Sequence, residues 1–211
     1  MLRIVLLALE CGFVFIGVPL LIKYRILPNF PIPYLVAAGV AAVFLLRHDP
    51  KFDSARLLAS SSDRTFLTQL LLRDLLCLVL LSAAVRLFAP ELLFSLIRQR
   101  PGLWVAIMIL YPLLSVYPQE VLYRAFFFHR YQELFGSGWA MLLASALAFG
   151  FIHIIFGNWL AVGLCIIGGL LFSFTYQQTG SLLLTCLDHA ILGNFIFTIG
   201  LGQFFYHGSR T

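Results

Sequence analysis

The residues that could take part in a chemical reaction lie in the second half of the sequence, inside otherwise apolar segments. They are one carboxylate, one guanidinium, two imidazoles and one amide, namely Glu120, Arg124, His153, His189 and Asn194. A carboxylate and an imidazole can together activate a water, while a second imidazole and an amide can stabilise an oxyanion. The same Glu and two His could instead hold zinc with an open fourth position. Both arrangements predict hydrolysis of an amide bond, and spacing alone does not separate them. No H-E-x-x-H occurs in the sequence.

The first motif is Gln119-Glu120-Val121-Leu122-Tyr123-Arg124. Glu120 and Arg124 are four residues apart, so on a helix they share a face and can pair. Pro118 precedes them and is expected to break the helix, which would make Gln119 and Glu120 first-turn residues at a positive dipole end. An oriented carboxylate suits a general base. The alternative is a structural Glu–Arg pair.

The second and third motifs each contribute an imidazole. His153 closes Phe149-Gly150-Phe151-Ile152-His153, and His189 begins a segment that continues to Gly193 and Asn194. On a regular helix His189 and Gly193 share a face, whereas Asn194 lies about 140° away. A single π-bulge would bring Asn194 round to that face. Asp188, beside His189, could orient a histidine or complete a polar network.

The elements that must position these residues are transmembrane helices. Of 211 residues, 61% are hydrophobic and 11% charged, and the mean hydropathy is +0.97. A soluble domain has about 25% charged residues, so this composition excludes an ordinary soluble globule. The net charge of +5 is typical of basic membrane-protein loops, and no basic run indicates a nucleic-acid partner. We predict an all-α polytopic bundle of about seven or eight spans forming a single membrane domain, 1–211.

Apolar runs and prolines place the expected helices. Segment 47–64 is the most polar and is expected to be an aqueous loop or interfacial helix, and 91–100 suits an amphipathic interfacial helix. Glu10 could be a structural partner or a functional group, while the adjacent Arg73 and Asp74 favour a structural role. The expected apolar helices are 2–22, 34–46, 66–88, one from 103 towards Pro112 and Pro118, 119–135, 139–156, 159–176 and 181–205.

The three motifs resemble those of the CPBP (Abi) intramembrane proteases, which include the type II CAAX prenyl endopeptidases. That family's pattern is E-E-x-x-x-R, then F-x-x-x-H, then H-x-x-x-N/D, on successive helices of a membrane bundle. The matching pieces are Gln119-Glu120…Arg124, Phe149…His153 and His189…Gly193-Asn194. Their order and distances fit, and the resemblance covers roughly 103–201, the expected protease core.

The resemblance implies a glutamic-type intramembrane endopeptidase. Carried over by motif, Glu120, His153, His189 and Asn194 would be catalytic, with Gln119 and Arg124 supporting. It implies a membrane protein or peptide substrate and the lipid bilayer as partners. It implies no metal cofactor, with zinc as the alternative.

Two positions depart from the family pattern. Gln119 stands where the family's water-activating Glu is usual, and a glutamine accepts no proton at neutral pH. Gly193 stands where an amide or carboxylate is expected. Either Glu120 takes over the role, or the protein is a catalytically degenerate binding or immunity protein. A small proton-coupled transporter is a third possibility, although no inverted repeat supports it.

The Gln-Glu variant resembles a prokaryotic subgroup associated with proteins that carry short C-terminal sorting tags (JDVT-CTERM type). That resemblance implies cleavage near the C-terminus of a tagged, membrane-anchored protein. It also implies a multi-pass protein of a prokaryotic inner membrane.

Overall fold

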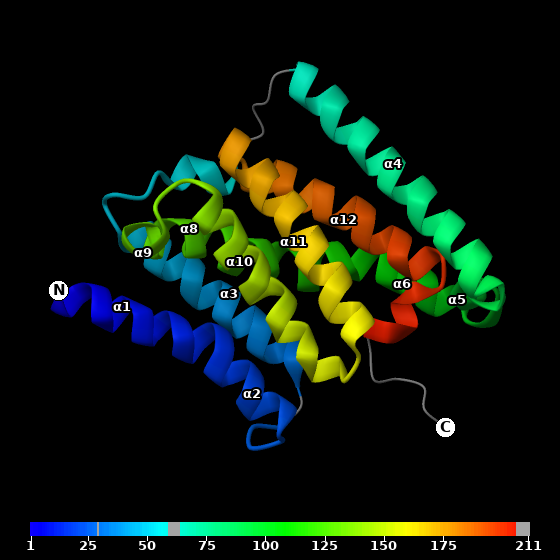
Figure 1. Ribbon diagram of the computed structural model, residues 1–211, viewed down its shortest axis with the longest axis horizontal. Coiled ribbons are helices and arrows are strands. Elements are labelled where there is room, and N and C mark those ends of the chain that lie inside the picture. Colours follow the sequence, from blue (N-terminus) through cyan, green and yellow to red (C-terminus); the bar gives the residue numbers. More distant parts are fainter. Residues whose placement is uncertain (29, 59–63, 206–211) are drawn as a thin grey trace.

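The protein is a bundle of helices (Figure 1). The computed structural model describes residues 1–28, 30–58 and 64–205. Within these ranges the chain forms helices and turns and contains no strand. Residues 59–63 of the predicted polar segment lie outside the described residues.

The polytopic helical bundle predicted from composition is confirmed. Among the described residues, five helices are long and apolar enough to cross a membrane, and a sixth apolar helix is shorter. This is fewer than the seven or eight spans expected from length. The long helix at 101–130 replaces two expected ones, the helix at 182–198 is short, and the expected span at 66–88 is not among the five. The five are Leu2–Lys23, Pro31–His48, Pro101–Arg130, Trp139–Phe156 and Trp159–Thr179, and the shorter one is Leu182–Thr198.

The N-terminal half surrounds the site residues with apolar helices. The first span joins α1 and α2 through a π-helical stretch, and α3 begins with Pro31 and Pro33 in its first turn. Helix α4 lies along the outside of the bundle beside α12 (Figure 1). The predicted interfacial segment 91–100 holds only short helices. The bounds are α1 Leu2–Gly12, π-helix Phe13–Gly17, α2 Val18–Lys23, α3 Pro31–His48, 3-10 helix Ser54–Leu57, α4 Arg64–Phe88, 3-10 helix Pro90–Leu92 and α5 Ser95–Gln99.

The central helix runs without a break from Pro101 to Arg130. The expected interruption at Pro118 was therefore wrong, and Glu120 lies in mid-helix, not at a dipole end. A π-helical stretch begins at Pro112 and ends just before Tyr117. Its wider turns accommodate prolines that would disrupt a regular α-helix. The bounds are α6 Pro101–Tyr111, π-helix Pro112–Val116, α7 Tyr117–Glu120, π-helix Val121–Phe126, α8 Phe127–Arg130 and then α9 Gln132–Phe135.

Three C-terminal helices complete the bundle. Asn158 caps α11 by accepting a hydrogen bond from the backbone N–H of Ala161, and Ser181 caps α12 by accepting one from Leu184. Gly180 ends α11 in the left-handed conformation, with φ +62°. The bounds are α10 Trp139–Ile152, 3-10 helix His153–Phe156, α11 Trp159–Thr179, α12 Leu182–Thr198 and 3-10 helix Leu201–Phe205.

Polar contacts at the rim join the elements. Glu10 accepts hydrogen bonds from Arg130 and Tyr131, which ties α1 to the end of the central helix. His129 lies 2.9 Å from Asp49, just after α3. The hydrogen bond from His129, together with one from the backbone N–H of Lys51, holds the pKa of Asp49 below its usual value. Glu10 thus has a structural partner.

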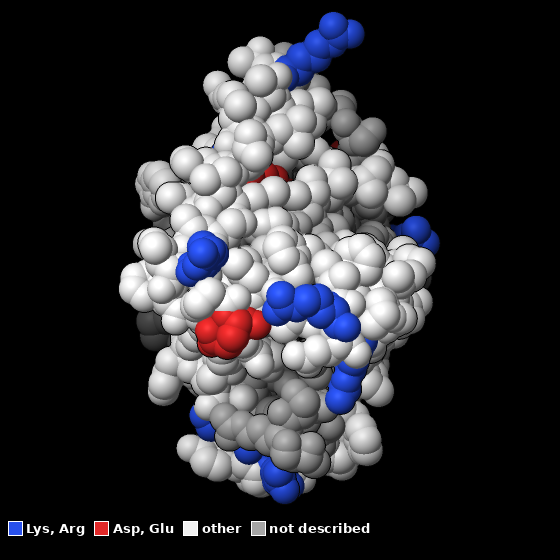
Figure 2. All heavy atoms as spheres, turned by 90° about the vertical axis from the view of Figure 1, so that its right-hand side faces the viewer, with Lys and Arg blue, Asp and Glu red and all other residues white. Residues whose placement is uncertain are grey.

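Basic side chains are scattered over an otherwise largely uncharged surface at the end of the molecule where α5 lies (Figure 2). On the α1 segment, large apolar side chains are also exposed, as they are on a surface that faces lipid. Leu2, Leu6, Leu9 and Phe13 are examples. The scattered basic side chains at the α5 end and the exposed apolar side chains on α1 both fit a protein that lies in a bilayer.

Helices α10 and α11 pack closely through glycines, and one of them offers a test of that packing. A Cβ atom on Gly169 would lie 3.0 Å from the Cα of Ala146, a backbone atom that cannot move alone. We expect Gly169→Ala to destabilise the protein by about 1–3 kcal/mol, measured by thermal unfolding in detergent. Gly163→Ala on the same helix is the matched control, since a Cβ atom there has no neighbour within 4 Å. Equal stability of the two variants would contradict this account of the packing.

Candidate active site

A buried ionic cluster joins the central helix to α12. The Oε1 atom of Glu120 lies 2.7 Å from Nδ1 of His189, and its Oε2 atom lies 3.2 Å from Nε of Arg124. Glu120 and Arg124 are both 0% exposed. The guanidinium lies over the ring of Phe149, 4.7 Å from the centroid. The predicted helical pairing of Glu120 with Arg124 is present, and His189 joins it through tertiary contact.

This cluster determines which nitrogen of His189 carries the proton. A carboxylate only accepts hydrogen bonds, so Nδ1–H of His189 donates to Glu120. The other ring nitrogen, Nε2, lies 3.0 Å from the hydroxyl of Tyr111. In neutral His189 this Nε2 atom is therefore the acceptor. Glu120 acts from behind the imidazole and orients it.

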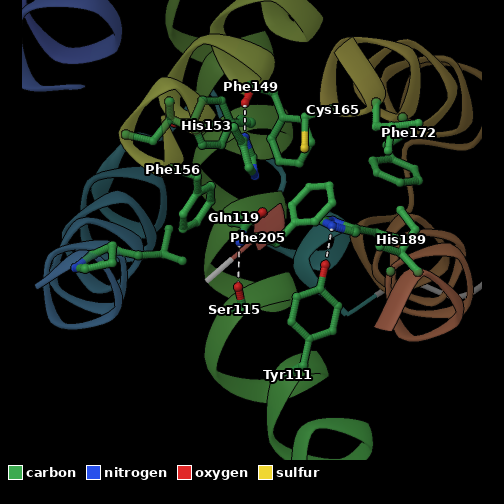
Figure 3. A pocket seen from close by; sticks show the side chains of 18 of the residues that line it. Tyr111, Ser115, Gln119, Phe149, His153, Phe156, Cys165, Phe172, His189 and Phe205 are labelled. Carbon is green, nitrogen blue, oxygen red and sulfur yellow. Dashed lines mark hydrogen bonds between the residues drawn. The ribbon is translucent and has the colours of Figure 1, made fainter. Parts of the chain in front are cut away.

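His189 opens onto a large, mostly apolar cavity. Its volume is about 980 Å³, and helices from both halves of the chain line it. Most of its lining side chains are aliphatic or aromatic, and a few polar ones converge on it. They include Tyr111, Ser115, Gln119, His153 and His189 (Figure 3), and two further tyrosines, Tyr34 and Tyr123, also line the cavity. An apolar cavity with a few convergent polar groups is typical of a ligand or substrate site.

His153 reaches the cavity from the point where α10 gives way to a 3-10 turn. Its Nδ1 atom lies 2.8 Å from the carbonyl oxygen of Phe149, which can only accept, so Nδ1 carries the proton. In the neutral ring the Nε2 lone pair is then free to take a proton. The ring of Phe149 lies 5.1 Å from that of His153 and 5.4 Å from that of His189, centroid to centroid. Both imidazoles thus belong to one site.

Gln119, and not Glu120, lines the cavity. Successive residues on a helix point about 100° apart, so these neighbours serve different faces. The amide nitrogen of Gln119 donates to Ser115 Oγ over 2.6 Å. Its Oε1 atom is buried and has no hydrogen-bond partner among the described residues. The amide therefore presents a free acceptor beside the cavity.

Asn194 lies away from the other predicted site residues. Its amide nitrogen donates to the carbonyl oxygen of Met108 over 3.3 Å, and it does not line the cavity. Helix α12 is α-helical from Leu182 to Thr198, so the π-bulge invoked to rotate Asn194 is not there. Gly193, which shares a face with His189, lines the cavity instead.

Tyr111 is a polar cavity residue that lies outside the three sequence motifs. One signal in the sequence could have found it. Tyr111, Ser115 and Gln119 recur every four residues along an apolar helix, so a single helical stripe carries all three.

Asp188 contacts α4 and α11. Its Oδ1 atom lies 2.6 Å from Arg73, and its Oδ2 atom accepts a hydrogen bond from Thr175 over 2.6 Å. Arg73 also pairs with Asp74 over 2.7 Å. Asp188 was expected either to orient a histidine or to complete a polar network, and these contacts correspond to the polar network. They also support the structural interpretation of Arg73 and Asp74.

A metal fits these residues poorly. Over the described parts of the chain, no group of three or more His, Cys, Asp or Glu side chains is placed to hold a metal ion. Glu120 instead pairs with His189 through Oε1 and lies beside Arg124 through Oε2, so its carboxylate is part of an ionic cluster.

Residues 101–196 match the model of one protein family, described as Type II CAAX prenyl endopeptidase Rce1-like. The matched segment contains every polar cavity residue named above except Tyr34, and it begins and ends close to the expected core of 103–201. No curated protein and no solved structure matches the chain.

Proposed function

Residues 101–196 belong to the Type II CAAX prenyl endopeptidase Rce1-like family, and from this premise we propose that the protein hydrolyses a peptide bond within the membrane. The bond lies near the C-terminus of a membrane-associated or C-terminally tagged protein. The observation that carries the proposal is the convergence of two oriented imidazoles and an amide on one apolar cavity.

His153 is the proposed general base. With its Nδ1–H donated to Phe149, its Nε2 atom can take a proton from a water in the cavity. The water oxygen then bonds to the carbonyl carbon, and the carbonyl oxygen becomes an oxyanion. When the C–N bond breaks, the same proton passes from His153 to the departing nitrogen. The free Oε1 atom of Gln119 is an acceptor that can orient the attacking water.

Glu120 and Arg124 are proposed positioning residues in this scheme. Glu120 holds the proton of His189 on Nδ1, and Arg124 compensates the buried carboxylate charge. The carboxylate of Glu120, which the sequence predicts as the base, thus does not line the cavity; its neighbour Gln119 does. A glutamine at position 119 is compatible with hydrolysis because His153 supplies the basic nitrogen.

The shape and lining of the cavity support an apolar substrate. A volume of about 980 Å³ accommodates a hydrophobic peptide segment or a lipid-modified residue. The substrate class that we propose is therefore a protein already held in the bilayer near its C-terminus. We place the reaction in a prokaryotic inner membrane.

We further propose that hydrolysis uses no bound metal, since no three His, Cys, Asp or Glu side chains among the described residues are placed to hold one. Treatment of the purified protein with 1,10-phenanthroline should leave its rate of cleavage unchanged. Loss of cleavage that added zinc restores would contradict the metal-free scheme.

The test compares three strains: one with the native protein, one without it, and one with His153→Asn. Membrane proteins are extracted from each, and their C-terminal peptides are catalogued by mass spectrometry. A few proteins should keep an additional C-terminal segment in the second and third strains only. If the strain without the protein has the same catalogue as the native strain, the protein does not cleave. If only the His153→Asn catalogue matches the native one, with that variant at native levels, cleavage does not need His153.

A further inference from the structure

We propose that Tyr111 is a catalytic residue whose hydroxyl donates a hydrogen bond to the oxyanion of the substrate. The proposal rests on the hydrolysis proposed above and assigns a role that the motifs left unfilled. Asn194, the residue expected in that role, donates to Met108 and lies outside the cavity lining.

The phenol is placed where an oxyanion donor is needed. Tyr111 lines the cavity, and its hydroxyl oxygen lies 3.0 Å from Nε2 of His189. The ring packs edge-on against Phe197, 5.3 Å between centroids, which restricts its orientation. In Figure 3, Tyr111 and His189 lie around the same space as Gln119 and His153. A carbonyl attacked by water from the His153 side can therefore place its oxygen near the phenol.

Gly193 makes room for this phenol. A Cβ atom at position 193 would lie 2.5 Å from the Tyr111 hydroxyl oxygen and 2.6 Å from Cε1 of its ring. Any side chain at position 193 would thus compete with the phenol for one space beside His189. The glycine on α12 and the tyrosine on α6 are therefore complementary. Position 193 has no side chain, and the neighbouring helix supplies the hydrogen-bond donor in its place.

The phenol hydroxyl can exchange one acceptor for another. In neutral His189 the phenol O–H donates to Nε2. Because the hydroxyl rotates about its C–O bond, the same O–H can turn from Nε2 to an oxyanion that forms in the cavity. Tyr111 forms no covalent bond to the substrate, and its proton stays on its oxygen.

The experiment measures kcat and KM on a synthetic peptide spanning a cleavage site found in the strain comparison. Tyr111→Phe keeps the ring and its packing against Phe197 and removes only the hydroxyl. We expect kcat to fall about 10²- to 10³-fold, the usual effect of losing one oxyanion donor, with KM within about twofold because the ground state loses little. Native kcat in Tyr111→Phe would overturn the assignment.

Tyr117→Phe is the matched control, because Tyr117 is on the same helix and does not line the cavity. It should keep native kcat. A second test moves the donor, since Tyr111→Ala with Gly193→Asn puts an amide into the space that the ring vacates. This double variant should exceed Tyr111→Ala alone in kcat by about tenfold. No cleavage by the native protein would refute the proposed function itself, which is a different outcome from an active Tyr111→Phe.

Discussion

Replacing His153 by asparagine should lower kcat by about 10²- to 10⁴-fold, the range associated with loss of a general base. Asparagine can still donate an N–H to the Phe149 carbonyl, which accepts from Nδ1 of His153 over 2.8 Å in the native protein. It lacks the second, basic nitrogen that faces the cavity. The variant should therefore fold and bind peptide but turn over slowly, with KM close to the native value.

The kinetic assay uses the purified protein in detergent and the same synthetic peptide. His48→Gln is the control, because His48 is an exposed residue at the end of α3 whose Nδ1 bonds to the Phe44 carbonyl. It has the same local hydrogen bond as His153 but lies away from the cavity. A native kcat in a folded His153→Asn variant would mean that the proton goes elsewhere, and the water-activating role would return to Glu120.

Replacing Arg124 by leucine should lower the free energy of unfolding by about 3–5 kcal/mol, the cost of removing one partner of a buried ion pair. Arg124 and Glu120 are both 0% exposed, and Nε of Arg124 is 3.2 Å from the carboxylate. The variant leaves that carboxylate with His189 as its remaining polar partner. Thermal or chemical unfolding in one detergent measures the difference.

Arg130→Leu is the matched control on the same helix. Its partner Glu10 is 2.6 Å away, but the two side chains are 45% and 34% exposed, so the loss should stay within about 1 kcal/mol. The double variant Glu120→Gln with Arg124→Leu removes the uncompensated charge as well. It should be more stable than Arg124→Leu alone. Equal stability of the Arg124→Leu and Arg130→Leu proteins would show that the buried pair contributes little to folding.

Adjacent residues of the first motif lie on different faces of the central helix. Gln119 faces the cavity, while Glu120 faces the buried cluster with Arg124 and His189. In the proposed scheme, this division separates the reacting groups from those that orient them. It also explains why a glutamine at position 119 leaves the ionic cluster intact, because the cluster depends on position 120.

From the sequence alone, the fold class, the membrane environment and the three motifs could be determined. These depend on composition and on local periodicity, which act within one helix at a time. The pairing of Glu120 with Arg124 follows from four-residue spacing, and the family match at 101–196 agrees with the motifs.

Only the tertiary structure decided which face of each helix meets the cavity. The sequence predicts a break at Pro118, but the helix continues through π-helical turns. These wider turns change the direction in which every later side chain points around the helix axis. The first of these turns places the Gln119 side chain on the cavity side of the helix. The contact between Tyr111 and His189 joins residues 78 positions apart, and the gap over Gly193 that permits it exists only where two helices pack. Periodicity describes a single helix, whereas the placement of a donor depends on the packing between helices.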